Sequence, residues 1–444
     1  MTVSPPPPDL APSAAPAAPA APSPAEGPRA VVGEWVVELA RPEDDAALRR
    51  LVASNPVPGR ITLGFEREPD YFAGCRAMGP FAQVAVARHR ESGVIGAMAC
   101  RAVRPRFVNG SERPVGYLSQ LRVDHPYRGR LLGAAVLRAL PLLHADGRTQ
   151  GYLASITDGN EEARGLLVRR ARQGLPIFRP LARLHTLALH VRHERRARGG
   201  GGGGGGGAGP ASEIEIGRGT AEDVGAVVSF LRREGRRRQF FPALTEADFG
   251  PGGAAVGPEP GDVVIARRGG QIAGAGALWD QGALKQTVVR GYAGALRWLR
   301  PAYNLGARLL GAPAVHLPAP GSPLRSAYAC FLAVAQDDPL VWRAVLRSLL
   351  SLAAARGLAY VLLGLAEGDP LLDVGRRFPH VAYGSTLYTV RPALDEGSSG
   401  ATLREGPPGA ERLVGLDELD RDELDRDELD RIDGRPAQVE IATL

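Results

Sequence analysis

Lysine is almost absent from this sequence, although basic residues are plentiful. Of the 54 basic residues, 53 are arginine and one is lysine, Lys285. So complete a bias indicates a GC-rich coding sequence rather than selection for phosphate contacts. The net charge of +6 divides into −7 for residues 417–433, with ten acids and three arginines, and +13 for the rest. A basic balance can indicate nucleic-acid binding, but this composition favours a chain with no nucleic-acid partner.

Cysteine and long apolar runs are also scarce. Three cysteines are too few and too scattered for a disulfide framework, which predicts a reduced, cytoplasmic protein. Prolines interrupt the apolar residues near the start of the chain, so no secretory signal is expected. The most apolar stretch, 346–366, contains Arg347 and Arg356, so no membrane span is expected either. The histidines lack cysteine or carboxylate partners at ligand spacing, and no metal site is predicted.

Three stretches of biased composition divide the chain. Proline and alanine dominate residues 1–30, nine consecutive glycines begin at Gly199, and residues 395–444 become an acidic pentad repeat. The leucines of that repeat lie about 140° apart around a helix, so they form no apolar face. We therefore expect disordered tails at 1–30 and 395–444 and a flexible linker at 199–209. The remaining stretches, 31–198 and 210–394, are each large enough to form a domain with its own core.

The two expected domains show the same order of elements. Each opens with a short strand, at 36–41 or 214–218, followed by an acidic N-cap region and an apolar-periodic helix. The first then predicts strands at 81–88, 94–103 and 115–123, a helix at 131–144, a strand at 151–156, a helix at 161–171 and a strand at 184–191. The second predicts strands at 263–266, 272–278 and 327–335, a helix at 340–355, and strands at 359–363 and 381–390. This order predicts an α/β (α+β) fold with a mixed sheet, repeated in tandem.

The segment that is most informative about function joins the expected strand 115–123 to the expected helix 131–144. It reads Leu121-Arg122-Val123-Asp124-His125-Pro126-Tyr127-Arg128-Gly129-Arg130-Leu131-Leu132-Gly133-Ala134. Backbone N–H groups at a helix start have no intrahelical partner and lie at the positive end of the helix dipole, so they favour a phosphate group. Gly129 allows close approach of the backbone, and Arg128 and Arg130 add charge.

This segment resembles motif A of the GNAT superfamily of acyl-CoA-dependent N-acyltransferases. In that motif a strand ends in valine, and a turn leads into Arg/Gln-x-x-Gly-x-Gly/Ala. Here Arg128 and Gly133 match the motif, while Leu131 stands at its middle glycine. The family's next element, Asn-x-x-Ala at a helix start, is present as Asn160-Glu161-Glu162-Ala163. The resemblance covers residues 34–192 and implies two tandem GNAT-like domains, an acetyltransferase domain and a degenerate second one.

The resemblance implies acetyl-CoA as the acyl donor. Its pantetheine arm would lie between the strands that end at Val123 and Ile156. The coenzyme would contact Leu121, Arg122, Val123, Arg128, Gly129, Arg130, Leu131, Leu132, Gly133, Ala134 and Asn160. The acceptor amine would attack the thioester directly, and a backbone N–H near Val123 would stabilise the oxyanion.

The general base and acid do not follow from the resemblance. Alternation along the strand predicts Tyr117, Ser119 and Leu121 on one face and Leu118, Gln120 and Arg122 on the other. Neither face holds the Glu or His that many relatives have, and Leu167 stands where relatives often place a tyrosine acid. The candidates are Tyr117, Glu66 and Asp158, and the further carboxylates near the expected site are Glu68, Asp70 and Glu161. A surface residue is the simpler interpretation of each carboxylate, and a packed strand aromatic that of Tyr117.

The second domain departs further from the motif. Its corresponding turn holds Asp337 and Asp338, whose charges would repel phosphate, so it is not expected to bind coenzyme A. Asp338 is expected to cap the helix that begins at Pro339. An insertion at 287–310 interleaves arginines with aromatics. That pattern suits nucleic acid or a membrane surface, but helices packed on the sheet are the favoured interpretation.

The sequence therefore predicts an N-acetyltransferase that transfers an acetyl group from acetyl-CoA to a small-molecule or peptide amine in a ternary complex. Two alternatives remain open. A non-catalytic, acyl-CoA-binding regulatory module would explain the missing base. An aminoacyl-tRNA-dependent transferase on the same paired fold would explain the degenerate second domain.

Overall fold

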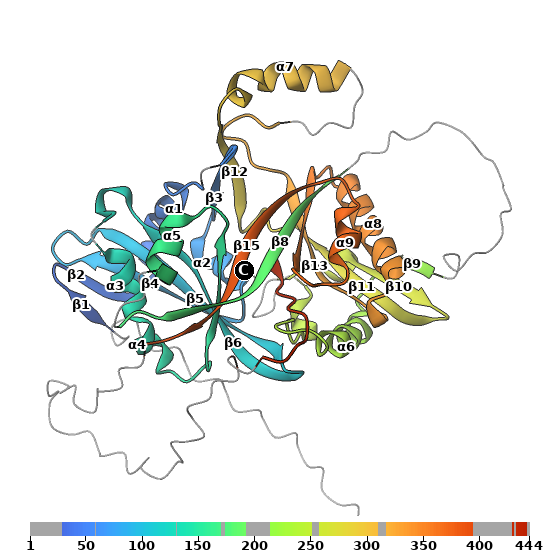
Figure 1. Ribbon diagram of the computed structural model, residues 1–444, viewed down its shortest axis with the longest axis horizontal. Helices are drawn as coiled ribbons and strands as arrows, with labels where there is room; N and C mark the ends of the chain where they lie inside the picture. The colour runs from blue at the N-terminus through green and yellow to red at the C-terminus, as the bar shows by residue number, and fades with distance from the viewer. Residues whose placement is uncertain are drawn as a thin grey trace, which may run out of the picture.

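One continuous mixed sheet runs through the whole structure (Figure 1). The structure is a computed structural model and describes residues 29–57, 59–129, 131–169, 174–191, 214–250, 257–309, 317–393, 429 and 432–441. The sheet has 13 strands in the order β1-β2-β4-β5-β6-β7-β15-β8-β14-β13-β11-β10-β9, and β12 and β3 form a separate two-stranded sheet. The expected tails and linker lie mostly outside the described residues.

Strands and helices follow one another in both halves largely in the order that the sequence predicts. The strands are β1 Ala30–Val32, β2 Trp35–Leu39, β3 Ile61–Glu66, β4 Phe81–His89, β5 Ile95–Val108, β6 Ser111–Val123, β7 Tyr152–Thr157, β8 Ile177–His190, β9 Ile214–Arg218, β10 Val263–Arg268, β11 Gln271–Trp279, β12 Gln286–Tyr292, β13 Ser326–Val334, β14 Tyr360–Ala366 and β15 His380–Arg391. The helices are α1 Asp45–Ala53, α2 Tyr71–Arg76, α3 Leu132–Arg138, α4 Leu140–His144, α5 Glu161–Arg164, α6 Val224–Gly235, α7 Leu296–Leu309, α8 Pro339–Ala355 and α9 Leu372–Arg376. The expected helix 131–144 is divided in two, with Pro141 in the first turn of α4.

The two halves exchange their last strands. β8, from the first half, lies between β15 and β14, while β15, from the second half, lies between β7 and β8. β15 pairs antiparallel with both neighbours, from Ser385–Thr157 to Val390–Tyr152 on β7 and from His380–Leu189 to Arg391–Ile177 on β8. A cut in the glycine-rich linker would therefore leave each half without a strand that its sheet uses.

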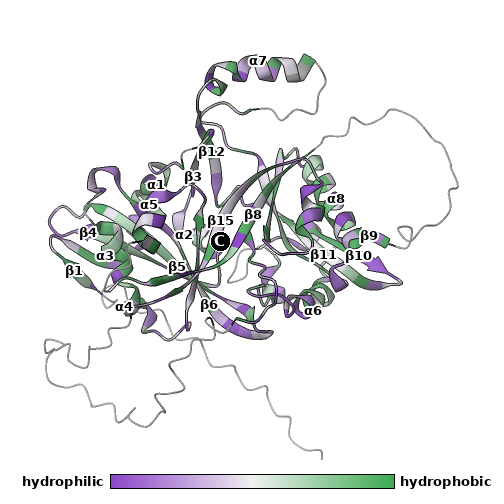
Figure 2. Ribbon diagram, in the orientation of Figure 1, coloured by the Kyte–Doolittle hydropathy of each residue, from purple (hydrophilic) through white to green (hydrophobic). Residues whose placement is uncertain are grey.

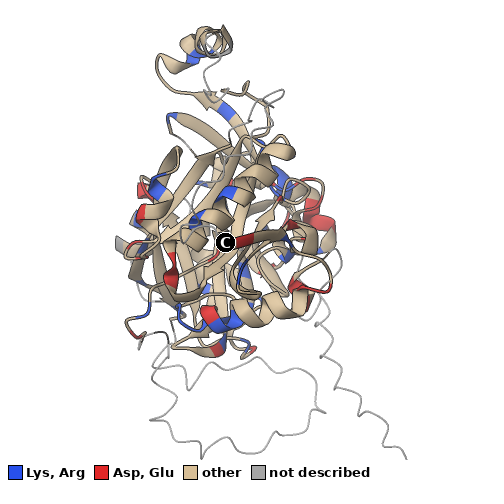
Figure 3. Cartoon of the chain, turned by 90° about the vertical axis from the view of Figure 1, so that its right-hand side faces the viewer, with Lys and Arg blue, Asp and Glu red and all other residues tan. Residues whose placement is uncertain are grey.

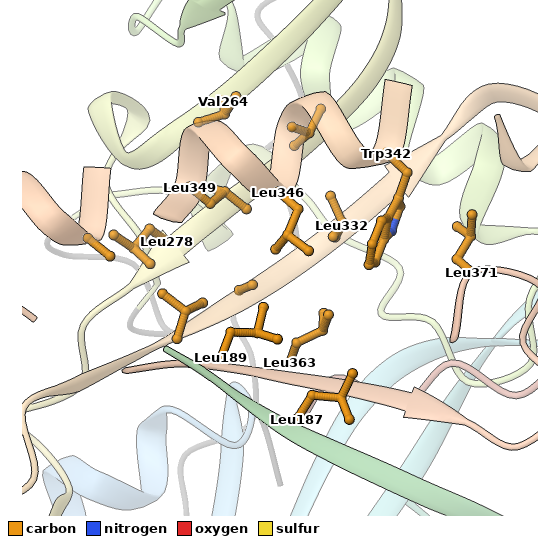
Figure 4. Packing of buried hydrophobic residues seen from close by; sticks show 14 of the residues in the cluster. Leu187, Leu189, Val264, Leu278, Leu332, Trp342, Leu346, Leu349, Leu363 and Leu371 are labelled. Atoms are coloured by element: carbon orange, nitrogen blue, oxygen red, sulfur yellow. The ribbon is translucent and has the colours of Figure 1, made fainter. Parts of the chain in front are cut away.

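Helices cover both faces of the sheet and enclose separate cores. In the first half, α1 and α2 pack on one face against Met98 and Cys100, and α3 packs on the other against Ala85 and Ala97. In the second half, α8 buries Trp342 and its leucines against β11, β13 and β14 (Figure 4). α6 covers the opposite face of that half. We call the two faces of the first half the α1 face and the α3 face.

The expectation that residues 395–444 stay outside the cores is wrong for their last part. Leu429 and Val439 are buried with Val108, Val115 and Leu184. Backbone bonds join this segment to the chain before β10, since Gln239 N donates to Pro436 O and Gln438 N donates to Gln239 O. The acidic composition of the repeat hid this: Leu429 belongs to the third pentad, and Val439 follows the repeat.

The expectation that 287–310 packs on the sheet is also wrong for its helical part. α7 stands apart from the body of the molecule and shows hydrophobic and hydrophilic residues along its length (Figures 1 and 2). Trp298 and Leu309 are 72% and 78% exposed. The insertion's first strand, β12, instead pairs antiparallel with β3 and so joins the two halves.

No helix within the described ranges is long and apolar enough to cross a membrane. On the face of the molecule turned to the viewer in Figure 3, acidic and basic residues are interspersed among the described segments.

Candidate active site

The two central parallel strands of the first half separate after three paired residues. β6 and β7 pair only from Gly116–Tyr152 to Leu118–Ala154. Beyond that point β7 pairs with β15 on its other side, while β6 runs on to Val123. Among the described residues, the edge of β6 from Ser119 to Val123 therefore has no strand partner on this side, which agrees with the divergence that the resemblance implied.

A β-bulge lies in β6 at the point of divergence. Cys100 of β5 pairs with Ser119, and Met98 pairs with Arg122, so one residue of β5 opposes two of β6. Gln120, in the bulge, has a φ of 55°, in the left-handed region that non-glycine residues seldom adopt. Its Oε1 is buried and has no hydrogen-bond partner among the described residues. The bulge thus holds a polar side-chain group that forms no hydrogen bond within the described sheet.

The bulge corrects the predicted alternation of side chains. Residues paired across antiparallel strands share a face, so Ser119 and Arg122 both lie on the α1 face with Cys100 and Met98. Leu121 instead packs with Ala134 and Leu137 on the α3 face. The prediction that Leu121 lies with Ser119 and Arg122 with Leu118 is wrong, because the extra residue reverses the alternation.

A cavity of about 620 Å³ connects the two faces of the sheet at this point. On the α3 face it is lined by Leu121, Leu137 and Leu167. On the α1 face it is lined by Arg67, Cys100 and Arg122, and the second half contributes Lys285 and Tyr328. A channel through the divergence of two strands can hold a donor on one face and an acceptor on the other.

The predicted coenzyme residues that the structure describes lie in three places: along the cavity, in the core under α3 and in the exposed turn before that helix. Leu121, Arg122 and Asn160 line the cavity. Asn160 also caps α5, because its Oδ1 accepts the N–H of Ala163 at 3.1 Å. Val123 and Leu132 belong to the core under α3, where Gly133 and Ala134 are also buried, while Arg128 and Gly129 are exposed before the helix. Arg130 lies outside the described residues.

The turn before α3 contains two residues in the left-handed region. Gly129 has a φ of 81° and open space around it. Leu131, which replaces the motif's middle glycine, has a φ of 60° and is 62% exposed. A left-handed conformation costs an L-residue about 1–2 kcal/mol, so the fold imposes a glycine-like backbone on this leucine. Arg128 donates to Asn55 Oδ1 at 2.7 Å.

Of the three predicted catalytic residues, Tyr117 and Glu66 line the cavity and Asp158 does not. Tyr117 is buried on β6, and its hydroxyl lies 2.8 Å from Ser155 Oγ on β7. Glu66 forms an ion pair with Arg290 on β12. Asp158 accepts a hydrogen bond from Arg183 at 2.6 Å. Both carboxylates thus have guanidinium partners.

The other named carboxylates are structural. Glu68 forms an ion pair with Arg49. Asp70 caps α2 by accepting the N–H of Ala73 at 3.0 Å, and Glu161 pairs with Arg164 at 3.4 Å on the surface. Each of these matches the interpretation of a surface or capping residue rather than a base.

Several polar residues of the cavity were not predicted. Among them are Arg67 just after β3, Lys285 in the loop before β12 and Tyr328 on β13. The ammonium group of Lys285 lies 5.3 Å from the centre of the Tyr328 ring. The only signal in the sequence was that Lys285 is the sole lysine. The lack of lysine was explained by a GC-rich coding sequence, so Lys285 was not predicted to belong to a site.

The second half repeats the bulge and the divergence but fills them with its own chain. β13 and β14 pair only from Ser326–Tyr360 to Tyr328–Leu362. β13 bulges where Phe331 has a φ of 53°. Gln438 Nε2 donates to Leu332 O at 3.0 Å, the N–H of Phe331 donates to the carboxylate of Glu440, and Ile441 lies against Gly364 of β14. Residues 438–441 thus occupy the place that the cavity has in the first half.

The helix start in the second half is also occupied. Asp338 Oδ1 accepts the N–H groups of Leu340 at 2.8 Å and Val341 at 3.3 Å, which confirms the predicted cap. Arg268 pairs with the same carboxylate at 3.0 Å. Asp337 pairs with Arg238 at 2.5 Å. Carboxylates therefore satisfy the positive groups that would attract a phosphate.

Neither a protein-family model nor a curated protein matches the amino-acid sequence. Solved structures do match the fold. A Saccharomyces cerevisiae N-myristoyltransferase with bound myristoyl-CoA aligns with a TM-score of 0.53 at 12% identity, over 82% of this chain and 85% of that one. A GCN5-related glucosamine N-acetyltransferase region of a fungal multi-domain β-N-acetylglucosaminidase aligns with a TM-score of 0.51 at 13% identity, over 82% of this chain but 38% of that one. The chain therefore has a GNAT-like fold that spans two halves, as the sequence predicted.

Proposed function

We propose that this protein is an N-acyltransferase that moves an acyl group, acetyl in the simplest case, from acyl-CoA to an amine. The observation that carries the proposal is the cavity through the divergence of β6 and β7. It gives the donor and the acceptor separate faces of one sheet and a common meeting point at the bulge. The same opening in the second half is filled, so we infer one active site per chain.

The α3 face has the groups needed to bind the acyl donor, acyl-CoA. The unpaired edge of β6 from Ser119 to Val123 offers backbone groups to the amides of a pantetheine arm, and Leu121 and Leu167 offer an apolar wall. The start of α3 and the open turn at Gly129 offer backbone N–H groups to a pyrophosphate. Acyl-CoA supplies a thioester carbonyl, and the backbone at the bulge supplies hydrogen bonds to the oxygen that becomes negative.

Tyr117 is suited to donate the proton that the leaving thiolate of coenzyme A needs. Burial raises the pKa of its hydroxyl, although the hydrogen bond to Ser155 and the charge of Arg106 oppose this. The hydroxyl therefore keeps its proton at neutral pH and can give it to the departing thiolate. Glu66 and Asp158 remain candidates for the base only if the acceptor displaces their arginine partners.

The setting that we propose is the cytoplasm, where thiols stay reduced. All three cysteines are free and buried, and the sulfur atoms of Cys75 and Cys100 lie 3.8 Å apart without a bond. We propose a small molecule or a peptide as the acceptor. The second half is not expected to bind coenzyme; it closes the cavity from the acceptor side.

Calorimetric titration of the full-length protein with acetyl-CoA tests the proposal. We expect one site per chain. Arg128→Glu and Gly133→Glu each place a negative charge beside the proposed pyrophosphate and should weaken binding at least 100-fold. Arg343→Glu makes the same change of charge as Arg128→Glu on the exposed side of α8 and should bind as the parent does. Unaltered affinity in Arg128→Glu and Gly133→Glu, with melting temperatures preserved, would refute the assignment of the coenzyme site.

A non-catalytic, acyl-CoA-binding module is the second candidate, because the Glu66 and Asp158 carboxylates are both held by arginine. Release of free thiol from acetyl-CoA in the presence of an amine panel separates the two. A module that only senses acyl-CoA binds it without turnover.

A further inference from the structure

Three cationic side chains from distant parts of the chain meet in the acceptor half of the cavity. Arg67 follows β3, Arg122 is the last but one residue of β6 and Lys285 precedes β12, and all three line the cavity. Burial lowers the pKa of both Arg122 and Lys285, and the positive charge of Arg67 lowers both further. Close packing fixes this arrangement, since a Cβ on Gly74 would lie 2.9 Å from Arg67 Nη1 and 3.1 Å from Leu284 O.

The guanidinium of Arg67 is almost fully buried, with 2% of the residue exposed. Its hydrogen-bond partners are two sulfur atoms, Cys75 Sγ at 3.7 Å and Met78 Sδ at 3.9 Å, and it lies 5.2 Å from the centre of the Tyr71 ring. These are weak acceptors for a full positive charge. Among the described residues, no carboxylate forms an ion pair with it.

Arg122 is in a similar position. Its Nη1 donates to the carbonyl of Leu121 at 3.0 Å, and its Nε is buried without a partner in the described part of the chain. Burial, and then the charge of Arg67, lower its pKa. A buried cation without a countercharge is costly, so both arginines are poised for an anion that enters the cavity.

The nearby carboxylates do not supply this countercharge. Glu66 lines the cavity but is paired with Arg290. Asp280 also lines it, but it is exposed, and its Oδ1 accepts the N–H of Gly282 at 2.8 Å. The cavity thus presents net positive charge on the acceptor side of the sheet.

We propose that Arg67, Arg122 and Lys285 bind an anionic group, a carboxylate or a phosphate, that the acyl acceptor carries in addition to its amine. The acceptor class is then an anionic amine such as an amino acid or a phosphorylated amine. Identification of the occupant as the acceptor rests on the proposed function, whereas the anion site itself stands on the cavity and its charges.

The site has a consequence for protons. Burial and the charge of Arg67 lower the pKa of Lys285 to about 7, while the Cys75 thiol opposes this and the Tyr328 ring lies beside the ammonium group. Lys285 therefore titrates much closer to neutral pH than an exposed lysine does. An anion bound beside it favours the ammonium form, so binding should raise this pKa and take up a proton.

The sole lysine gives a direct test. Full-length protein produced with ¹³C-labelled lysine shows one lysine side-chain signal in the NMR spectrum, and its pH titration reports Lys285. We expect a midpoint near pH 7 that acetate or inorganic phosphate raises saturably, by about one unit for a tenfold preference for the charged form. Acetamide, the neutral counterpart of acetate, should not move it. A response to acetate indicates a carboxylate, and a response to phosphate alone indicates a phosphate.

Two variants test the partners of Lys285. In Arg67→Met the anion response should be lost and the midpoint without anion should rise, because the neighbouring positive charge is gone. If that variant does not fold, Arg122→Met should lose most of the response. Arg343→Gln, on the exposed side of α8, should behave as the parent does.

The proposal is overturned if neither acetate nor phosphate moves the midpoint, or if acetamide moves it equally. Failure of this site and failure of the proposed function are separable, because acetyl-CoA binding is measured independently. An anion response without acetyl-CoA binding would leave the site in place and refute the transferase. Acetyl-CoA turnover without an anion response would support the transferase and refute the anion site.

Discussion

Glu440 should make the protein less stable as the pH rises through neutrality, and Glu440→Gln should remove this effect. The carboxyl group is buried in the opening between β13 and β14. Burial raises its pKa from 4.5 to about 7, although the N–H of Phe331 and the charges of Arg106 and Arg104 oppose this. The folded protein is therefore more stable when this carboxyl group is protonated than when it is charged.

The magnitude follows from linkage. A pKa that is higher in the folded state contributes stability that is fully present below the unfolded value and is lost as the pH rises through the folded value. The shift from 4.5 to about 7 corresponds to about 3 kcal/mol, at about 1.4 kcal/mol per pH unit. Between pH 4.5 and 8 the free energy of unfolding of the parent should fall by about this amount relative to Glu440→Gln.

Urea unfolding followed by far-UV circular dichroism at several pH values measures the difference. Glu43→Gln, which removes an exposed carboxylate, is the control and should show a constant difference from the parent. The opposite sign would refute the reasoning. If the buried guanidinium groups of Arg104 and Arg106 outweighed the burial of Glu440, the substitution would destabilise the protein at pH 8 by about 3–5 kcal/mol, the cost of breaking a buried ion pair.

Two further predictions concern the two openings in the sheet. Tyr117→Phe should lower the rate of acyl transfer about 100-fold, which is the lower end of what a general acid contributes. Calorimetry should show that the affinity for acetyl-CoA is unchanged. An unchanged rate would remove Tyr117 from the mechanism. Deletion of residues 432–444 should lower the melting temperature and increase binding of an apolar dye, because Val439 and its neighbours leave a core. The stoichiometry of acetyl-CoA should stay at one, since Asp338 still occupies the start of α8; a second site would show that residues 432–444 alone block coenzyme there.

The local parts of the fold and site could be predicted from the sequence. Hydrophobic periodicity and capping residues predicted the repeated order of strands and helices and the cap at Asp338, because each depends on residues a few positions apart. The strand, turn and helix around Arg128 and Gly133 were predicted for the same reason. The sequence also singled out Tyr117 and Glu66, and both line the cavity.

Contacts between distant residues decided the rest. The bulge at Gln120 depends on how β6 pairs with β5, and it places Arg122 on the α1 face and Leu121 on the α3 face. The exchange of β8 and β15 and the packing of Val439 join residues that lie far apart in the chain.

Lys285 shows most clearly the difference between what the sequence determines and what tertiary packing decides. Its identity as the sole lysine was visible in the sequence, but its chemistry comes from Arg67, Cys75 and Tyr328, which only the tertiary structure brings around it. Local sequence determines conformation because backbone hydrogen bonds and caps act over a few residues. The charge state of a buried group depends instead on desolvation and on neighbouring charges, and those neighbours are set by tertiary packing.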